Sequence, residues 1–239
     1  MEPWSAEEFV TQLRQVGQDH YHDKHPYHVS MNEGRLTPDQ IQLWVANRYY
    51  YQKSIPLKDA TLLSRCPLRE VRRVWVQRIL DHDGYGDDPG GIEKWLRLGE
   101  GLGVRREEVS DWRTFTRTHF AMSTLRTYSR YWDWSWLDGL ATFYAVDLHW
   151  REYYGKVRDA LADHYHVDDR ALEFFSVLLA DTESHIPWEE EALAYWPCTT
   201  ERQLTAARSF RERLDIENQL LVALEQARTE EKLPYQVPA

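Results

Sequence analysis

Apolar residues recur at three- and four-residue spacing along most of the chain, which is the pattern of amphipathic α-helices. Ser5 and Glu8 are spaced as a capping box before the first such pattern, and Thr37 and Gln40 repeat that signal before the next long one. Sustained alternation of polar and apolar residues, the pattern of a half-buried strand, does not occur. The pattern predicts helices over residues 6–17, 38–55, 57–65, 69–81, 92–101, 114–132, 135–164 and 200–228, and another between Asp168 or Asp169 and Pro187.

Glycine and proline divide these patterns into separate elements. Pro56 is expected to end the long second helix, and Gly84 to end the helix that starts at Arg69. Thr200 and Gln203 are spaced as a third capping box, before the last helix. The chain has no internal repeat and no linker, and its one obvious glycine-rich loop covers 84–91. We therefore expect a single all-α domain over residues 1–239, a compact bundle of seven or more helices.

Composition and charge narrow the class of partner. The chain has 239 residues and a net charge of −10, which argues against binding to nucleic acid or to an anionic membrane, because both select basic faces. No apolar run approaches the roughly 18 residues that cross a bilayer, and the acidic N-terminus is unlike a signal peptide. Cys66 and Cys198 form no metal-binding spacing. Two thiols in so long a chain favour a cytoplasmic location.

Several basic and amide side chains share helix faces with apolar residues. Arg48 and Gln52 are four residues apart, as are Arg78 and His82, so each pair lies on one face of its helix. Lys58 follows Pro56 closely. If these faces converge, they form a cationic cavity within an acidic chain, which favours a ligand that carries carboxylates. The alternative is that each pair lies on a solvated surface.

Imidazole groups gather in two places. Tyr21, His22, His25 and His28 surround Pro26, and His149 lies within a tryptophan-rich helical pattern. A neutral imidazole is well suited to general acid–base catalysis near neutral pH. A single buried histidine is, however, more often a hydrogen-bonded core residue than a catalyst.

A carboxylate-bridged di-iron centre is a further alternative. Such a site needs several carboxylates and histidines on facing helices. His149 and Glu152, and likewise Asp181 and His185, have helical spacing, but no third and fourth carboxylates lie at matching positions. The chain has no GxSxG or HExxH motif and no reactive-cysteine signature, which argues against hydrolytic chemistry. The sequence therefore favours a site without metal.

Five segments of the first half form a specific combined motif. They are HDKHPYH at 22–28, WVANRYYYQ at 44–52, IPLKDA at 55–60, and the stretches 75–84 and 90–100. Together they resemble the pyrroloquinoline-quinone synthase (PqqC) family, with near-continuous similarity from about residue 17 to 103. The resemblance implies a haem-oxygenase-like, or TenA-like, helical bundle that forms a homodimer.

The resemblance also implies a reaction, the final step of pyrroloquinoline quinone (PQQ) biosynthesis. In that step a polycarboxylate, amino-acid-derived quinone precursor undergoes ring closure and oxidation. Dioxygen is the co-substrate and hydrogen peroxide is released, without a metal or an organic cofactor. The implied partner is therefore this small molecule or PQQ itself.

Residue roles follow from the same resemblance. It implies catalytic roles for His82, His22, Tyr21 and His149, and substrate-binding roles for Arg48, Gln52, Lys58, Arg78 and Arg213. Three of the binding residues, Arg48, Lys58 and Arg78, suit charge-assisted hydrogen bonds to the carboxylates of the precursor. Ring closure and oxidation need protons removed next to carbonyl groups, and His82 is the candidate base.

The second half departs from the family pattern beyond Arg117. Thr142 stands where the family has a carboxylate, Glu152 replaces an arginine, and the apolar region 171–175 aligns with tyrosine and arginine ligands. Arg213 replaces a lysine and keeps only its charge. Two alternatives therefore stay open. One is a PqqC-like oxidase or oxygenase, with or without di-iron, acting on another amino-acid-derived molecule, and the other is a helical protein that carries a quinone without turning it over.

Overall fold

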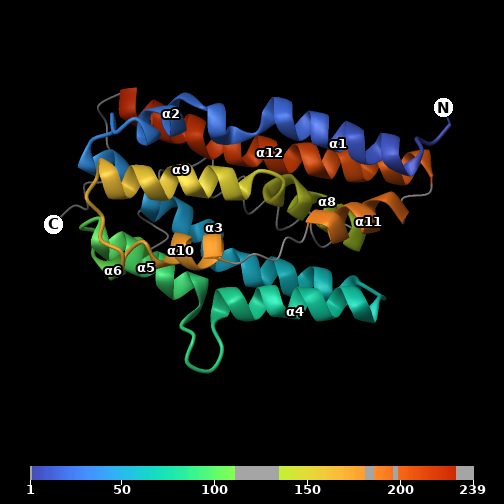
Figure 1. Cartoon of the computed structure of the whole chain (residues 1–239), viewed down its shortest axis with the longest axis horizontal. Coiled ribbons are helices and arrows are strands. Elements are labelled where there is room, and N and C mark those ends of the chain that lie inside the picture. The colour runs from blue at the N-terminus through green and yellow to red at the C-terminus, as the bar shows by residue number, and fades with distance from the viewer. Residues whose placement is uncertain (1, 111–134, 181–185, 196–198, 230–239) are drawn as a thin grey trace.

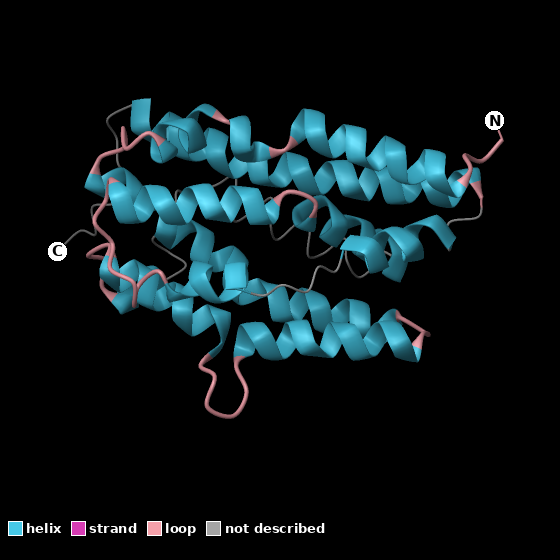
Figure 2. Ribbon diagram, viewed as in Figure 1, coloured by secondary structure: helices cyan, strands magenta, loops and turns pink. Residues whose placement is uncertain are grey.

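The computed structural model describes residues 2–110, 135–180, 186–195 and 199–229, and every regular element in these ranges is a helix (Figures 1 and 2). The all-α prediction of seven or more helices is confirmed. None of the described helices has the length and apolar character to span a membrane. The elements are α1 (Ala6–His20), η1 (His22–Lys24), α2 (Pro26–Asn32), α3 (Pro38–Arg65), α4 (Arg69–Asp83), α5 (Gly90–Gly101), α6 (Arg106–Ser110), α8 (Trp136–Asp147), α9 (Trp150–Asp163), α10 (Glu173–Ala180), α11 (Ile186–Tyr195) and α12 (Thr200–Thr229).

The helices pack in layers around α3 and α8. The first and last helices, α1 and α12, lie side by side, and α12 also packs along α8 and against α3 (Figure 1). On the other side α3 packs against α4 and α5, and α9 packs against α2 and α10. Large aromatic side chains fill the space between the layers, among them the fully buried Trp44, Trp95, Phe143 and Phe210. The polar groups described below lie between these layers.

Two of the predicted capping boxes are present, and the third is wrong. Ser5 with Glu8 and Thr37 with Gln40 cap α1 and α3 as expected. At α12 the cap is Thr199, whose hydroxyl accepts the Arg202 N–H at 3.4 Å. Gln203 cannot complete a box because its side-chain amide instead donates to the Trp4 carbonyl and accepts the Trp4 N–H, both at 2.9 Å. A contact with the chain start thus replaces the local contact.

Pro56 does not end a helix, contrary to the sequence prediction. The helix α3 runs unbroken from Pro38 to Arg65 with Pro56 inside it. Proline removes one backbone donor, but tertiary packing of the flanking residues Ile55, Lys58 and Leu62, all buried, offsets that loss. The single helix ends instead at Arg65, with Cys66 as its C-cap just before Pro67. The predicted binding residues Arg48, Gln52 and Lys58 therefore lie on one continuous helix.

The pattern predicted as one helix over 135–164 is two helices. The helix α8 ends at Asp147 and α9 begins at Trp150, with His149 as the residue before it at φ −130° and ψ 3°. Leu148 packs tightly against Gly17 of α1, where a β-carbon added to the glycine would lie 2.6 Å from the leucine Cδ2. The break between α8 and α9 thus places both Leu148 and His149 next to Gly17 of α1. The predicted helix over 114–132 lies outside the described residues.

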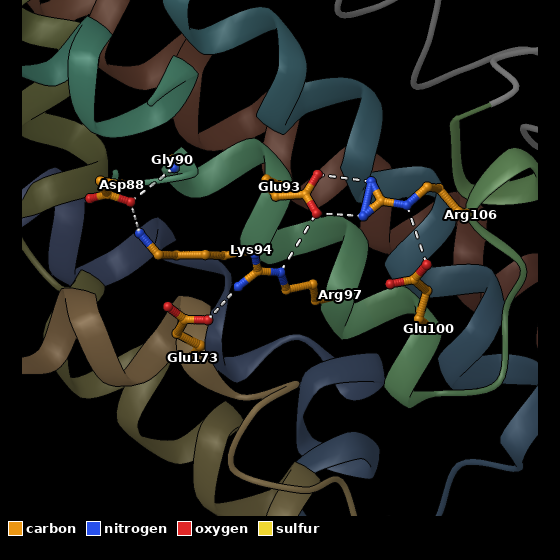
Figure 3. Close-up of polar contacts among 8 residues, drawn as sticks. All are labelled: Asp88, Gly90, Glu93, Lys94, Arg97, Glu100, Arg106 and Glu173. Carbon is orange, nitrogen blue, oxygen red and sulfur yellow. Dashed lines mark hydrogen bonds and ion pairs between the residues drawn. The ribbon is translucent and has the colours of Figure 1, made fainter. Parts of the chain in front are cut away.

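The glycine-rich loop is fastened at both ends. Gly84 is the C-cap of α4 and has a φ of 91°. A β-carbon at Gly90 would lie only 2.4 Å from the Gly84 nitrogen, so the backbones of the two glycines are in close contact. Asp88 accepts the Gly90 N–H at 2.9 Å and pairs with the buried Lys94 of α5 (Figure 3). The loop thus fixes the end of α4, where His82 lies.

Candidate active site

The helix α3 supplies three of the predicted site residues. Arg48, Gln52 and Lys58 are all buried, with side chains turned into the bundle and not to solvent. The inward orientation removes the alternative of a solvated face for these residues. The side-chain amide nitrogen of Gln52 has no hydrogen-bond partner among the described residues, although it is buried. A donor left in this state is ready to bind a ligand.

Arg48 and Arg213 share one carboxylate. Nη1 of Arg48 lies 2.7 Å from Oε2 of Glu217, and Nη2 of Arg213 lies 2.6 Å from Oε1 of the same residue. Both guanidinium groups also lie over the ring of Tyr51, at 5.2 Å and 4.7 Å from its centre. Burial alone would raise the pKa of Glu217, but the two arginines more than offset it and hold that pKa well below its usual range.

A second polar group surrounds Arg78 and Lys58. Nη1 of Arg78 lies 3.2 Å from Oδ2 of Asp147, and its Nε lies 3.7 Å from Oδ2 of Asp59. Nζ of Lys58 lies 3.8 Å from Oδ1 of Asp59 and 3.6 Å from the centre of the Phe143 ring. Burial lowers the pKa of Lys58, and the positive charge of Arg213 lowers it further despite the opposing effect of Asp59.

Glu189 of α11 completes this group as a buried acid. Its side chain is 2 % exposed, and its Oε2 has no hydrogen-bond partner among the described residues. Burial and the neighbouring Asp147 raise the pKa of Glu189 well above its usual range, and Arg78 only partly offsets them. The protein environment therefore favours the neutral acid form of Glu189.

His82 lies on the last turn of α4, next to the glycine-rich loop. Its Nδ1 lies 2.8 Å from the carbonyl oxygen of Arg78, and a carbonyl can only accept a hydrogen bond, so Nδ1 carries the proton. Burial lowers the pKa of His82 to about 4, which keeps the ring neutral near pH 7. Its Nε2 therefore holds a free electron pair, as a general base requires.

Tyr21 and His22 belong to a cluster of closely packed rings that interacts electrostatically with Arg48 and Glu217. The two rings stack at 4.4 Å, and Tyr153 of α9 meets His22 edge-on at 4.6 Å. Burial lowers the pKa of His22 to about 3. His149 meets the Tyr21 ring edge-on at 4.9 Å, and its Nε2 is buried without a partner in the described part of the chain.

The structure buries six of the nine predicted residues and half-buries Arg78, His82 and His149, and their contacts define two groups. One surrounds Glu217 and contains Arg48, Arg213, Tyr21 and His22, with His149 against Tyr21 and with Gln52 one turn from Arg48 on α3. The other surrounds Asp59 and contains Lys58 and Arg78, with His82 held by the Arg78 carbonyl. Lys58 links the groups electrostatically, because Arg213 contributes to its lowered pKa. Burial favours the neutral forms of Lys58, Asp59 and Glu189.

The counter-charges were missed at the level of sequence. Glu217, Asp59, Asp147 and Glu189 pair with or face the predicted cations, yet none of them was a predicted site residue. Glu217 follows Arg213 by four residues on one helix, and that spacing was the available signal. Asp147 and Glu189 carried no such signal, because their partner Arg78 lies on a distant helix.

Of the four residues of the di-iron alternative, the structure describes His149 and Glu152. Asp181 and His185 lie outside the described residues. Glu152 is exposed and pairs with Lys156 at 2.6 Å, so its carboxylate already has a cationic partner at the surface. Across the ranges 2–110, 135–180, 186–195 and 199–229, no group of three or more histidine, cysteine, aspartate or glutamate side chains is arranged to hold a metal ion.

Comparison with solved structures defines the class of fold. A domain with a heme oxygenase-like fold from Shewanella denitrificans superposes with a TM-score of 0.69 at 14% identity, covering 97% of this chain and 96% of the other. A TenA homolog from Pseudomonas syringae pv. tomato gives a TM-score of 0.71 at 14% identity, over 91% and 93% of the two chains. The protein therefore has the haem oxygenase-like fold that the sequence resemblance implied.

Sequence comparison then shows the family. Residues 10–186 match the TENA/THI-4/PQQC family model, and the chain belongs to that family. A protein of Cronobacter sakazakii named pyrroloquinoline-quinone synthase is 38% identical over 235 residues, which are 97% of this chain and 91% of that protein. The protein of the same name from Pseudomonas aeruginosa is 38% identical over 95% of this chain and 90% of its own length. The similarity thus extends well past the first half, where the motifs are densest.

Proposed function

We propose that this protein is a cofactor-independent oxidase that carries out the final ring closure and oxidation of PQQ biosynthesis. The observation that carries the proposal is the identity of about 38% with pyrroloquinoline-quinone synthases over about 97% of the chain. The buried positions of Arg48 and Lys58 and the half-buried positions of Arg78 and His82 support it, because fully exposed side chains could not enclose a substrate. Oxygen serves as the electron acceptor and needs no site on a metal.

Charge in the interior favours an anionic substrate. With Lys58, Asp59 and Glu189 shifted toward their neutral forms, the permanently charged groups are the guanidinium groups of Arg48, Arg78 and Arg213. Three carboxylates, Glu217, Asp147 and Asp59, lie within ion-pair distance of these three cations in the described part of the site. Burial disfavours the ionised form of Asp59, and guanidinium groups are suited to bind an incoming carboxylate through bidentate hydrogen bonds.

The base would be His82. Its unprotonated Nε2 removes a proton from carbon or nitrogen next to a carbonyl, and the substrate becomes electron-rich. Each two-electron oxidation then passes two electrons and two protons from the substrate to dioxygen, giving one hydrogen peroxide. Gln52 and His149 would bind polar atoms of the substrate, because both hold buried nitrogens without described partners.

Turnover of the quinone precursor under metal-free conditions tests this function. We expect oxygen uptake and peroxide release with chelator-treated protein, at a stoichiometry set by the number of two-electron oxidations. Absence of turnover with protein that binds PQQ would favour the alternative of a quinone carrier. Recovery of activity only after iron is added, with stoichiometric metal, would instead contradict the cofactor-free proposal.

One observation favours a related enzyme with a different substrate. Thr142 stands where the PqqC resemblance expects a carboxylate, and its buried hydroxyl donates to the Gly139 carbonyl of its own helix at 2.7 Å. Phe174 and Phe175, in the region that aligns with polar ligands, pack against Trp95. The positions of Thr142, Phe174 and Phe175 are therefore less polar than the resemblance predicts. Competition between the PQQ precursor and other amino-acid-derived quinones, measured by kcat/KM, distinguishes the two substrates.

A further inference from the structure

His28 lies directly behind His22 and takes no part in the assignments above. It is 2 % exposed and lies on α2, and its Nδ1 is 3.0 Å from the carbonyl oxygen of His22. The same Nδ1 is 3.4 Å from Nδ1 of His22, and the opposite nitrogen, Nε2, is 3.0 Å from the hydroxyl of Tyr153. Three polar partners therefore hold one buried ring.

These partners determine where His28 carries its proton. A carbonyl oxygen has no hydrogen to give, so the short contact to the His22 oxygen requires N–H at Nδ1 of His28. Burial and the nearby His22 lower the pKa of His28 well below its usual range, so the ring is neutral and Nε2 is unprotonated. The Tyr153 hydroxyl therefore donates to Nε2.

The proton on His28 in turn determines the state of His22. Two N–H groups cannot face each other across a contact of 3.4 Å without repulsion, so Nδ1 of His22 must present its electron pair to His28. The ring of His22 is also buried and neutral. Its single proton therefore lies on Nε2. At His82 the arrangement is the reverse, because the Arg78 carbonyl holds the proton on Nδ1.

We propose that His28 is a positioning residue that fixes His22 as an Nε2–H hydrogen-bond donor, while His82 presents an unprotonated Nε2 as the base. This assignment rests on the proposed oxidase function and divides the work of its two imidazoles. His82 removes a proton, and His22 donates a hydrogen bond to the substrate oxygen on which negative charge develops. His22 is thereby excluded as a second base, because the electron pair of its Nδ1 is directed at His28.

Nitrogen NMR of the histidine rings tests the assignment without any turnover. Long-range proton–nitrogen spectra of uniformly 15N-labelled protein at pH 7.5 separate protonated from unprotonated ring nitrogens. We expect the unprotonated signal at Nδ1 for His22 and at Nε2 for His82 and His28. A protonated Nδ1 at His22 would overturn the proposal even if the enzyme is fully active. The predicted tautomers in a protein that fails to turn over the PQQ precursor would instead contradict the proposed function alone.

Substitution of His28 tests its positioning role. In His28→Asn the amide N–H takes the place of Nδ1–H, so we expect His22 to keep its tautomer and kcat to stay within about threefold of the native value. In His28→Leu the donor is lost, and we expect a mixed tautomer at His22 and a fall in kcat of roughly tenfold or more, with KM little changed.

His25→Asn is the matched control, because His25 caps α2 by accepting the Tyr27 N–H at 3.2 Å and asparagine can do the same. It should leave both the tautomer of His22 and kcat unchanged. Equal loss of kcat in His28→Asn and His28→Leu, with the native tautomer at His22 in both, would show that His28 serves only packing.

Discussion

At the scale of single residues, Glu217 joins two buried cations, because its carboxylate lies within ion-pair distance of both Arg48 and Arg213. Removing one member of a buried ionic group leaves the others uncompensated. We expect Glu217→Gln to lower the free energy of unfolding by roughly 3–5 kcal/mol at pH 7. Urea unfolding followed by circular dichroism measures this, and a loss below about 1 kcal/mol would show that the two arginines find other partners.

The same carboxylate predicts a response to acid. Because the folded pKa of Glu217 is lowered, its ionised form stabilises the protein above its unfolded pKa of about 4.5. That contribution is lost as pH falls below this value toward the folded pKa. We therefore expect the difference in unfolding free energy between the native protein and Glu217→Gln to shrink below pH 4.5. A constant difference between pH 7 and pH 3 would contradict the assignment.

For Glu189 we expect the opposite dependence of the free energy of unfolding on pH. Its folded pKa is raised, so above the unfolded value of 4.5 the unfolded chain ionises while the folded protein resists ionisation, and stability falls as pH rises. Glu189→Gln removes that loss and nearly keeps the shape of the side chain, so we expect a higher free energy of unfolding at pH 8. The exposed Glu191→Gln is the control and should change little. A destabilised Glu189→Gln would mean that the carboxylate is ionised in the fold.

His82 is the residue whose loss separates chemistry from binding. We expect His82→Ala to lower turnover of the quinone precursor by on the order of a hundredfold or more, because a positioned base contributes that much. The dissociation constant for PQQ should change less than about threefold, since the arginines and Lys58 remain. Single-turnover absorbance and fluorescence titration give the two quantities. Turnover at the native rate in this variant would remove His82 from the mechanism.

Sequence reasoning was more complete for the cations than for their partners. Helical spacing placed Arg48 with Gln52 and Arg78 with His82, and the structure buries Arg48 and Gln52 on one face of α3. Spacing within one helix says nothing about a partner on another, and Arg48 meets Glu217 across 169 positions. The tautomers of His22 and His82 were equally out of reach, because carbonyl and ring contacts decide them.

At the scale of elements, a single glycine sets the approach of α8 to α3. A β-carbon at Gly139 would lie 1.9 Å from Cδ2 of Leu62, so the two helices touch where no side chain fits. One turn further along α8, Phe143 lies under Lys58 and Arg78. The close contact therefore also sets the distance between that aromatic ring and the two cations.

Gly139→Ala tests the close approach. We expect it to lower the free energy of unfolding by roughly 1–3 kcal/mol, because overpacking forces the helices apart. Gly155→Ala is the matched control: Gly155 also lies within a helix but has no atom near the position of a β-carbon. That variant should gain about 0.4–1 kcal/mol. Adding Leu62→Ala to Gly139→Ala should relieve the overlap, and failure to do so would locate the strain elsewhere.

Element boundaries show where local signals stop being decisive. Capping boxes at Ser5 and Thr37 were predicted correctly because both partners of each box lie within one turn, whereas Gln203 bonds to the distant Trp4 and the box predicted at Thr200 does not form. The continuity of α3 through Pro56, and the break at His149, depend instead on packing against other helices. A proline costs one hydrogen bond locally, and a long buried helix tolerates that cost.

At the scale of the whole molecule, buried neutral histidines make the fold sensitive to mild acid. In the unfolded chain His22, His28 and His82 bind protons near pH 6.5, whereas burial lowers the folded pKa of His82 to about 4 and that of His22 to about 3. The unfolded state therefore binds more protons in this window, and stability falls as pH decreases.

We expect each of these histidines to contribute a slope of up to about 1.4 kcal/mol per pH unit between pH 6 and pH 4.5. His28→Asn should reduce the total slope by the share of one histidine. His166→Asn, on the exposed surface at a backbone φ of 55° that asparagine tolerates, is the control for exchanging a histidine for asparagine. Urea unfolding at a series of pH values gives the slopes. A native slope near zero over this interval would show that the rings are protonated inside the fold.

The ionic contact between Arg48 and Glu217 also has a consequence for synthesis on the ribosome. Arg48 is translated early, but its counter-ion is added only with α12, near the end of translation. A nascent chain that has already assembled α1 through α9 would hold a guanidinium group in an apolar interior without its neutralising partner. The ion pairs around Arg48 are therefore complete only when the last helix emerges, so premature termination upstream of residue 217 removes the core ion pair along with the C-terminal part of that helix.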